Sequence, residues 1–560
     1  MKKRPVATSS ASSADCDARF VIALLEGWPV RLDRILTGGE IFMLKADIAW
    51  GDLSQNPEWK HGVIALGRSQ IAPFQHAALE TLVVQTQERW FAVVRERVAG
   101  AAVSENASFQ NVDSERFDEL YRACLLWPLD YVMVEVAKQG RRVKLRAGML
   151  GAAPVYCRAT DEQVRVSWDF ADFLSDRLPI DFEAASCSLG LEQVYSSRQI
   201  CIGVYLLTER ATLYLEPGRA HYRYPSPFEV PAAPAMECAD AVSMFDQLLR
   251  RVIAKRPAAP GRIAVELSGG MDSAAVACAL ADLHGPVASR GILVGGECRV
   301  PQVERRRQIA DRLRLSDETV DIDAIPPSLD LSPDGHKAYV NTEYYLEAFE
   351  TLWSTARAQG RDLMYTGLGG DELFMGTGVV AEDNVAGGRS IGDPQRFARQ
   401  LLTPRALSAL RSLHAFDAPA GPVPSVMASV SKAHHLMQHG MWPINPLSDP
   451  DLMVFCYQLP LELRRRRTTM QLYLDARLGE DVFPRNYAKE TFAQVFPELI
   501  ARHRTALAGQ LRECALADLG LVDQRAALAL LDTVATTKAV APTSPLINFL
   551  WTERFARQLT

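Results

Sequence analysis

The sequence lacks several features that would assign it to a familiar class of protein. No glycine is followed directly by lysine, so the chain cannot supply the lysine of a Walker phosphate loop. The ten cysteines are scattered without paired spacing, which is typical of a reducing compartment and not of a disulfide framework. The apolar run at 20–25 is too short for a membrane span or a signal peptide. A net charge of −6 gives no case for binding nucleic acid or anionic membranes. We therefore expect a cytoplasmic protein with neither a nucleic-acid partner nor a membrane span.

What remains is the composition of an ordinary globular protein. Its 560 residues, 48% hydrophobic and 23% charged, are enough for two domains. A proline-rich stretch at 226–236 disfavours both helix and central strand and is predicted to be a linker. The predicted domains are therefore 1–225 and 237–560.

The segment Val265–Ser273 carries the most specific signal. Residues 262–267 have the pattern of a buried strand, and residues 274–283 have the small apolar side chains of a packed helix. Gly269 and Gly270 would then form a turn at a helix N-terminus, where free N–H groups and the helix dipole attract phosphate. Ser268 and Ser273 add hydroxyl donors. The segment predicts a site for pyrophosphate and hence for ATP.

Asp272 would repel a bare phosphate, so its presence in this turn predicts a bridging cation. Mg²⁺ takes one or two carboxylates together with phosphate oxygens. The second carboxylate is predicted to be Asp371, in a glycine-rich turn that follows a short strand near 362–365. Because a Walker lysine is missing, we expect cleavage between the α and β phosphates. The alternation of strands and helices from 262 to 315 predicts a doubly wound parallel sheet.

Together these motifs resemble a known family. Residues 268–273 (Ser-Gly-Gly-Met-Asp-Ser) and 367–372 (Gly-Leu-Gly-Gly-Asp-Glu) are similar to the N-type ATP pyrophosphatase domain of the asparagine synthetase family. Residues 446–449, 459–463 and 483–492 resemble three further segments of that family, and the family lysine falls on Lys489. The resemblance covers about 235 to 500.

The resemblance implies an AMP-forming carbon–nitrogen ligase. Members of this family activate a carboxylate as its acyl-adenylate and let an amine displace AMP, using ATP and Mg²⁺. Asp272 and Asp371 would hold the metal, and Lys489 would stabilise the leaving pyrophosphate and the later oxyanion. The family places adenine at Val294. The predicted ATP site consists of Leu267, Ser268, Gly269, Gly270, Asp272, Ser273, Val294, Thr366, Gly367 and Gly369.

The N-terminal region is similar to a degenerate class II glutamine amidotransferase domain, an Ntn-type β-rich sandwich. Alternating, β-rich runs at 131–137, 142–146 and 163–168 predict strands, and residues 148–156 are similar to a hairpin of that fold. Glutamine-using members begin with a catalytic cysteine, whereas this chain begins Met-Lys-Lys-Arg and its first cysteine is Cys16. We predict a domain that keeps the scaffold without glutaminase activity. The fold class is thus α/β with α+β, with helical additions to the C-terminal domain.

Family members without glutaminase include β-lactam synthetases and the macrolactam synthetases of lasso peptides. Three residues before the second metal aspartate, asparagine synthetases carry glutamate and β-lactam synthetases tyrosine; this chain has Leu368. Leucine cannot take a proton, whereas a peptide's N-terminal amine is partly neutral at about pH 8. A lasso-peptide macrolactam synthetase is therefore favoured, with a precursor peptide as substrate and a leader peptidase and leader-binding protein as partners. Another amide synthetase, of the β-lactam or ammonia-dependent asparagine type, and a non-catalytic ATP-binding protein that docks a partner remain alternatives.

Four other features lie outside the predicted site. His434, His435 and His439 are interpreted as helix packing, although an i, i+4 pair could bind metal. The arginines at 464–467 could bind phosphate or an acidic peptide, but a solvated helix start is favoured. Those at 305–307 are expected on an exposed helix side. The glycine-rich segment 376–390 is hypothesised to be a lid.

Overall fold

The computed structural model describes residues 44–100, 107–192, 195–226, 238–333, 335, 339–374, 393–415, 423–484, 487 and 489–559. Cys16 and the predicted lid at 376–390 lie outside the described residues, as does almost all of the predicted linker at 226–236. The domain boundary at the linker therefore stays a prediction. Residues 41–560 form one compact unit.

The centre of the C-terminal region is a five-stranded parallel sheet in the order β17-β16-β15-β18-β19. The chain starts in the middle strand, runs outward through two neighbours, and then returns to the other side. This confirms the predicted doubly wound parallel sheet. Its topological switch point lies between β15 and β18, where open α/β sheets bind their ligands. The strands are β15 (Ile263–Glu266), β16 (Ala288–Leu293), β17 (Ser316–Asp321), β18 (Leu363–Tyr365) and β19 (Trp442–Ile444).

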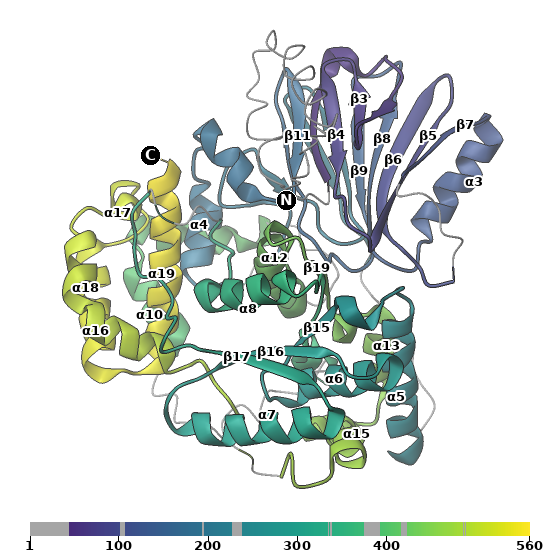
Figure 1. The fold of residues 1–560 in the computed structure, drawn as a ribbon. Helices are drawn as coiled ribbons and strands as arrows, with labels where there is room; N and C mark the ends of the chain where they lie inside the picture. Colours follow the sequence, from purple (N-terminus) through teal and green to yellow (C-terminus); the bar gives the residue numbers. More distant parts are fainter. Residues whose placement is uncertain are drawn as a thin grey trace, which may run out of the picture. The chain divides into compact units, whose positions relative to one another are not determined.

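Helices cover both faces of this sheet, so its central strands are buried and apolar (Figure 1). Ile263 and Val265 share a hydrophobic cluster with α6 (Met271–His284), while Ala264 and Met364 share one with α8 (Leu346–Ala358) and α12 (Val423–Gln438). Successive side chains of a strand point to opposite faces of the sheet, so one set packs against α6 and the other against α8 and α12. The remaining helices around the sheet are α5 (Cys238–Ala254), α7 (Arg299–Leu313), α9 (Gly370–Leu373), α13 (Pro450–Gln458), α14 (Leu461–Arg464) and α15 (Thr468–Leu478).

The N-terminal region contains two seven-stranded sheets. One hydrophobic cluster includes inward-facing side chains from both, so the sheets pack face to face. The strands predicted at 131–137, 142–146 and 163–168 are confirmed as β8, β9 and β11; the amidotransferase-like ancestry stays a prediction. The first sheet contains β12 (Tyr205–Leu206), β10 (Tyr156–Ala159), β11 (Gln163–Ser167), β1 (Leu44–Ala49), β4 (Ser69–Pro73), β3 (Val63–Leu66) and β2 (Glu58–Lys60). The second contains β14 (Arg219–Arg223), β13 (Thr212–Glu216), β9 (Val143–Ala147), β8 (Tyr131–Ala137), β6 (Arg89–Glu96), β5 (Leu79–Gln85) and β7 (Ala107–Asn111), with α3 (Ser114–Leu125) beside it.

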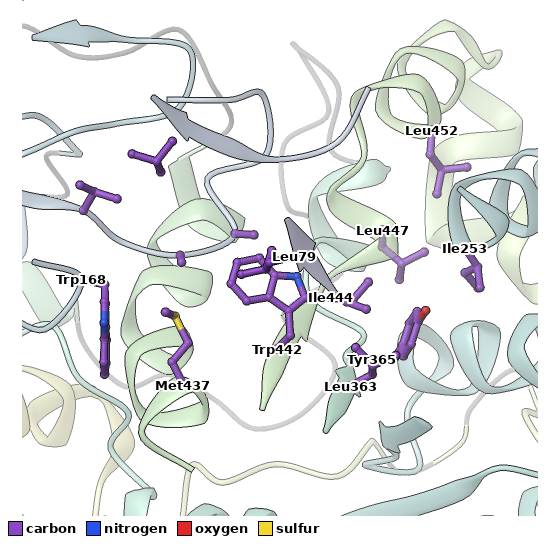
Figure 2. Close-up of a cluster of buried hydrophobic side chains, with 14 of the residues drawn as sticks. Leu79, Trp168, Ile253, Leu363, Tyr365, Met437, Trp442, Ile444, Leu447 and Leu452 are labelled. Atoms are coloured by element: carbon purple, nitrogen blue, oxygen red, sulfur yellow. The ribbon is translucent and has the colours of Figure 1, made fainter. Parts of the chain in front are cut away.

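The N-terminal sheets and the parallel sheet share one continuous core. Figure 2 shows Trp442 of β19 beside Leu79 of β5, with Met437 and Trp168 to the left of Trp442 in this view. At this junction the Trp442 indole donates a hydrogen bond of 2.7 Å to the buried Glu96 carboxylate. Arg256 donates two further hydrogen bonds of 2.8 Å to the same carboxylate. A buried ion pair with these extra donors fixes the edge strand of the parallel sheet against the N-terminal region.

The end of the chain is helical, in agreement with the helical additions expected for the C-terminal domain. Together with α4 (Phe182–Leu189), α10 (Pro394–Leu401), α11 (Pro404–Ala409) and residues near 339, these helices form a second hydrophobic core. No helix in the described parts of the chain has both the length and the apolar content needed to cross a membrane. The helices at the end of the chain are α16 (Val495–Gln510), α17 (Ala515–Asp518), α18 (Gln524–Thr537) and α19 (Val540–Leu559).

Candidate active site

The first glycine turn connects β15 to α6, as predicted. Gly269 has φ +96°, a conformation that favours glycine, and Gly270 caps the helix. The Gly270 N–H donates to the Ser268 hydroxyl at 3.1 Å, and the Ser273 hydroxyl donates to the Gly270 carbonyl at 3.1 Å. The two serine hydroxyls lie 3.2 Å apart. Two hydroxyls and the start of a long helix thus converge on one turn, an arrangement suited to an anion.

The second glycine turn connects β18 to α9 and touches the first. Gly369 also lies in the left-handed region, with φ +97°. A side chain at Gly367 would lie 2.7 Å from the backbone nitrogen of Ser273, and one at Gly370 would overlap the Asp272 carboxylate. Glycine is therefore required at Gly367 by the backbone of the first turn and at Gly370 by the side chain of Asp272. This packing places Asp272 beside the turn that carries Asp371.

Two cationic side chains meet the paired carboxylates. Arg467 Nη1 lies 2.7 and 2.9 Å from the two carboxylate oxygens of Asp272, and its Nη2 forms an ion pair with Asp371. The Lys489 ammonium lies 3.8 Å from Asp371. Burial raises the pKa of the Asp272 carboxyl, while Arg467 and Lys489 act in the opposite direction. The structure thus brings together the three charged residues expected from the sequence, and it adds Arg467, which sequence reasoning missed.

The interpretation of residues 464–467 as a solvated helix start is therefore corrected at Arg467. Arg465 and Arg466 are exposed, but the Arg467 side chain is only 17% exposed and bridges both aspartates. A run of four arginines in an acidic chain was the available signal. Composition does not reveal which member of such a run turns inward.

The residues present fit a divalent cation. Two carboxylates converge at the switch point, and the guanidinium of Arg467 is the positive group that occupies the space between them. Mg²⁺ is held in proteins by one or two carboxylates together with phosphate oxygens. Asp272 and Asp371 would supply these carboxylates. Bound there, the metal would neutralise charge on the phosphates of a nucleotide.

A second buried ion pair, Arg305 with Glu490, supports the first turn. Arg305 Nη2 lies 2.7 Å from the Glu490 carboxylate, and the Arg305 Nε–H donates to the Gly269 carbonyl. The Ser268 hydroxyl donates to Glu490 at 3.0 Å. The expectation that 305–307 form an exposed side is wrong for Arg305 and Arg306, which are 4% and 1% exposed. Helix α7 turns both toward the sheet, and only Arg307 is exposed.

The predicted adenine residue lies next to the first turn. Val294 follows β16 and is buried, and its backbone N–H donates to the Gln302 side chain at 2.9 Å. The Gln302 amide in turn donates to the Ser268 carbonyl at 2.8 Å. Leu267 is also buried, and its N–H donates to the Arg290 carbonyl at 2.7 Å. Gln302 is a further residue at this site that the motifs did not reveal.

Uncharged groups support the second turn. The Thr366 hydroxyl donates to the Asn445 side chain at 2.6 Å and accepts the Leu368 N–H at 3.1 Å. The Ser448 hydroxyl donates to the Leu368 carbonyl at 3.2 Å. Asp449, in the same predicted motif segment, instead caps α13 and pairs with Lys255 at 3.1 Å. The segment at 446–449 therefore contributes to the turn through a neutral hydroxyl.

The three histidines near 435 do not form a metal centre. His434 and His435 are buried in α12, where they contact the Val430 carbonyl and Thr342 respectively. No set of three His, Cys, Asp or Glu side chains is placed to hold a metal among the described residues. Helix packing accounts for the burial of His434 and His435, whereas His439 lies just after α12, 3.8 Å from the Glu350 carboxylate.

Comparison with known proteins gives one family. Residues 244–421 match the family described as asparagine synthase, and no curated protein matches the chain. Among solved structures, the chain is similar to the U34-tRNA thiolase NcsA from Methanococcus maripaludis with its 4Fe-4S cluster. The identity is 13% over 47% of this chain and 91% of that one, with a TM-score of 0.20, which carries no argument. The matched range includes both glycine turns but neither Arg467 nor Lys489. The match supports the asparagine synthetase family and indicates ATP-dependent amide-bond formation by this domain.

Proposed function

We propose that the protein is a lasso-peptide macrolactam synthetase. In this proposal it adenylates the side-chain carboxylate of an Asp or Glu in a core peptide, and the peptide's N-terminal amine then displaces AMP to close an isopeptide ring. One observation carries the proposal: Asp272 and Asp371 converge at the switch point of the sheet, next to a turn that has Leu368 where related enzymes place a polar residue.

The first half-reaction uses the charged side of the site. A carboxylate oxygen of the peptide attacks the α-phosphorus of ATP, and pyrophosphate leaves. Ser268, Ser273 and the N-terminus of α6 are suited to hold the departing anion. Lys489, half exposed and close to Asp371, is suited to stabilise charge as it develops on the leaving group. The products of this step are an acyl-adenylate and pyrophosphate.

The second half-reaction needs an amine that is already neutral. The side chains that hydrogen-bond to the Leu368 backbone are the Thr366 and Ser448 hydroxyls, which do not titrate near neutral pH. A peptide α-amine has an ordinary pKa of about 7.7–8.0, so a useful fraction is unprotonated without help. The amine attacks the acyl carbon, AMP leaves with the bonding electron pair, and the ammonium proton passes to solvent. An intramolecular amine also gains from proximity.

Two other amide-forming activities remain candidates within the same chemistry. A β-lactam synthetase and an ammonia-dependent asparagine synthetase would both use the ATP site, but each family pattern places a polar residue where Leu368 stands. A non-catalytic ATP-binding protein that docks a partner is a further alternative. The close pairing of Asp272, Asp371 and two cations argues against it, because charged groups are costly to hold together without a use.

Intact mass spectrometry of a leader-free linear peptide tests the proposal. The peptide carries an N-terminal glycine and a downstream Asp or Glu, and is incubated with the protein, its leader peptidase, any leader-binding partner and Mg-ATP. We expect the peptide to lose one water with stoichiometric AMP. Peptides with an acetylated N-terminus, or with Asn or Gln replacing the acceptor, should give no ring. An unchanged peptide, in a preparation that makes AMP from free aspartate and ammonia, would favour asparagine synthesis instead.

A further inference from the structure

The Arg467 side chain lies between the two carboxylates expected to hold a metal. One terminal nitrogen of its guanidinium contacts both oxygens of Asp272, and the other contacts Asp371. A planar guanidinium presents several donors at fixed angles and can hold two carboxylates at once. Arg467 therefore occupies the space between the two carboxylates that would hold a metal ion.

The backbone at Arg467 adopts a conformation that is unfavourable for a non-glycine residue. Arg466 and Arg467 have φ of 50° and 56°, in the left-handed region that non-glycine residues rarely adopt. The flanking turn is fixed by the Thr468 hydroxyl, which donates to the Arg465 carbonyl at 2.7 Å, and by the Thr469 hydroxyl, which donates to the Leu463 carbonyl at 2.9 Å. Strain of this kind is concentrated at functional sites.

The charges in direct contact at this cluster balance one another. Asp272 and Asp371 contribute two negative charges, and Arg467 and Lys489 contribute two positive ones. Glu490 is separately neutralised by Arg305. A divalent ion entering alone would have to expel the guanidinium and would leave an excess of positive charge. A divalent ion entering with a triphosphate would not, because the phosphates supply negative charge and accept guanidinium hydrogen bonds.

We propose that Arg467 fills the metal site in the nucleotide-free protein, so that divalent metal binds only together with ATP. When the metal and nucleotide arrive, the guanidinium leaves the two carboxylates and pairs with the phosphates. This inference rests on the proposed ATP site, though not on the identity of the peptide or of the amide product. It makes Arg467 an internal substitute for Mg²⁺.

The test is metal binding without nucleotide, measured with Mn²⁺ by electron paramagnetic resonance. Arg467→Gln removes the competing charge, and we expect it to bind one Mn²⁺ about tenfold to a hundredfold more tightly than the wild type. Arg467→Lys keeps a charge and should stay near the wild type. Arg465→Gln, which alters an exposed neighbour, serves as the matched control and should not change Mn²⁺ affinity. Adding Asp272→Asn to Arg467→Gln should abolish the gain.

A second titration includes a non-hydrolysable ATP analogue with a methylene bridge between the α and β phosphorus atoms. With the analogue the wild type should bind Mn²⁺ tightly, and the advantage of Arg467→Gln should disappear or reverse. Equal affinities of wild type and Arg467→Gln for Mn²⁺ without nucleotide would overturn the proposal, as would an Arg467→Lys protein that binds Mn²⁺ as tightly as a folded Gln variant. Failure to bind Mn²⁺ in any protein would overturn it as well. Because no peptide is present, a failure of macrolactam synthesis would not affect these outcomes.

Discussion

The two glycine turns touch each other, but the groups that support them differ in charge. Behind the first turn, the buried Arg305–Glu490 pair contacts Ser268 and Gly269. Behind the second, the supporting side chains are neutral: Thr366, Asn445 and Ser448. Asp371, at the start of α9, is the residue of the second turn that contacts the charged cluster, through its ion pair with Arg467. In the proposed mechanism, the first turn would hold the phosphates and the second would shape a neutral approach for the amine.

The largest effect is expected from removing the charge of either carboxylate, Asp272 of the first turn or Asp371 of the second. Asp272→Asn and Asp371→Asn keep the side-chain volume but remove a charge that we propose holds the metal, so AMP formation should fall by about a thousandfold or more. Release of AMP in the presence of peptide is the measurement. Asp532→Asn, at an exposed position in α18, should leave it unchanged. Full activity of either site variant would remove the basis for the metal assignment.

The next largest effect should separate catalysis from binding. Lys489 is 55% exposed and lies beside Asp371, so Lys489→Met should fold and bind ATP within a few-fold of the wild type. Product formation should nevertheless fall by about a hundredfold, because in the proposed mechanism Lys489 stabilises the leaving group. Calorimetry of ATP binding and mass spectrometry of product distinguish the two quantities. Equal losses in both would mean that Lys489 acts through ground-state binding.

A smaller effect, on stability, tests the charged support of the first turn. Glu490→Gln leaves the guanidinium of Arg305 buried without its carboxylate, and the free energy of unfolding should fall by about 3 kcal/mol. Urea denaturation followed by circular dichroism measures this. Replacing both partners, Arg305→Met with Glu490→Met, should recover most of the loss because neither charge is then left unpaired. A double variant less stable than the single one would show that the pair itself is stabilising.

The smallest effect is expected at the neutral turn. Thr366→Val removes the hydroxyl that joins Asn445 to the Leu368 N–H, at a cost of about 1 kcal/mol in stability. ATP affinity should change by less than about threefold, because both hydrogen-bond partners of this hydroxyl are neutral groups. Ser268→Ala is the matched change in the first turn and should weaken ATP binding by about tenfold. Equal effects of the two variants on ATP affinity would erase the distinction between the turns.

The glycine turns were predictable from sequence because their signals are local. Gly269 and Gly369 occupy left-handed positions, and serine and aspartate stand at fixed offsets from them, so the motif and its geometry coincide. The doubly wound parallel sheet was predicted from the alternation of strands and helices, whereas the order of its strands is a finding of the structure. Element boundaries were less accurate: the strand expected at 262–267 is β15, Ile263–Glu266, because Arg262 still belongs to the short 3-10 turn Pro260–Arg262.

The supporting charges were not predictable because they come from distant segments. Arg467 is 195 residues from Asp272 in the chain, and Glu490 is 222 residues from Ser268. Arginine runs at 305–307 and 464–467 have the composition of solvated helix faces, and only tertiary packing turns Arg305, Arg306 and Arg467 inward. A buried arginine differs from an exposed one in its partner, and the partner is not visible in local sequence.

Transfer of oxygen from substrate to AMP tests the central claim most directly. The acceptor side chain of the peptide is labelled with ¹⁸O in its carboxyl group and incubated with the protein, the partners used above and Mg-ATP. Activation as an acyl-adenylate predicts that the released AMP carries one ¹⁸O, with pyrophosphate unlabelled. Label in inorganic phosphate together with ADP would show activation by phosphorylation instead, and would contradict the assignment of this site to AMP-forming chemistry.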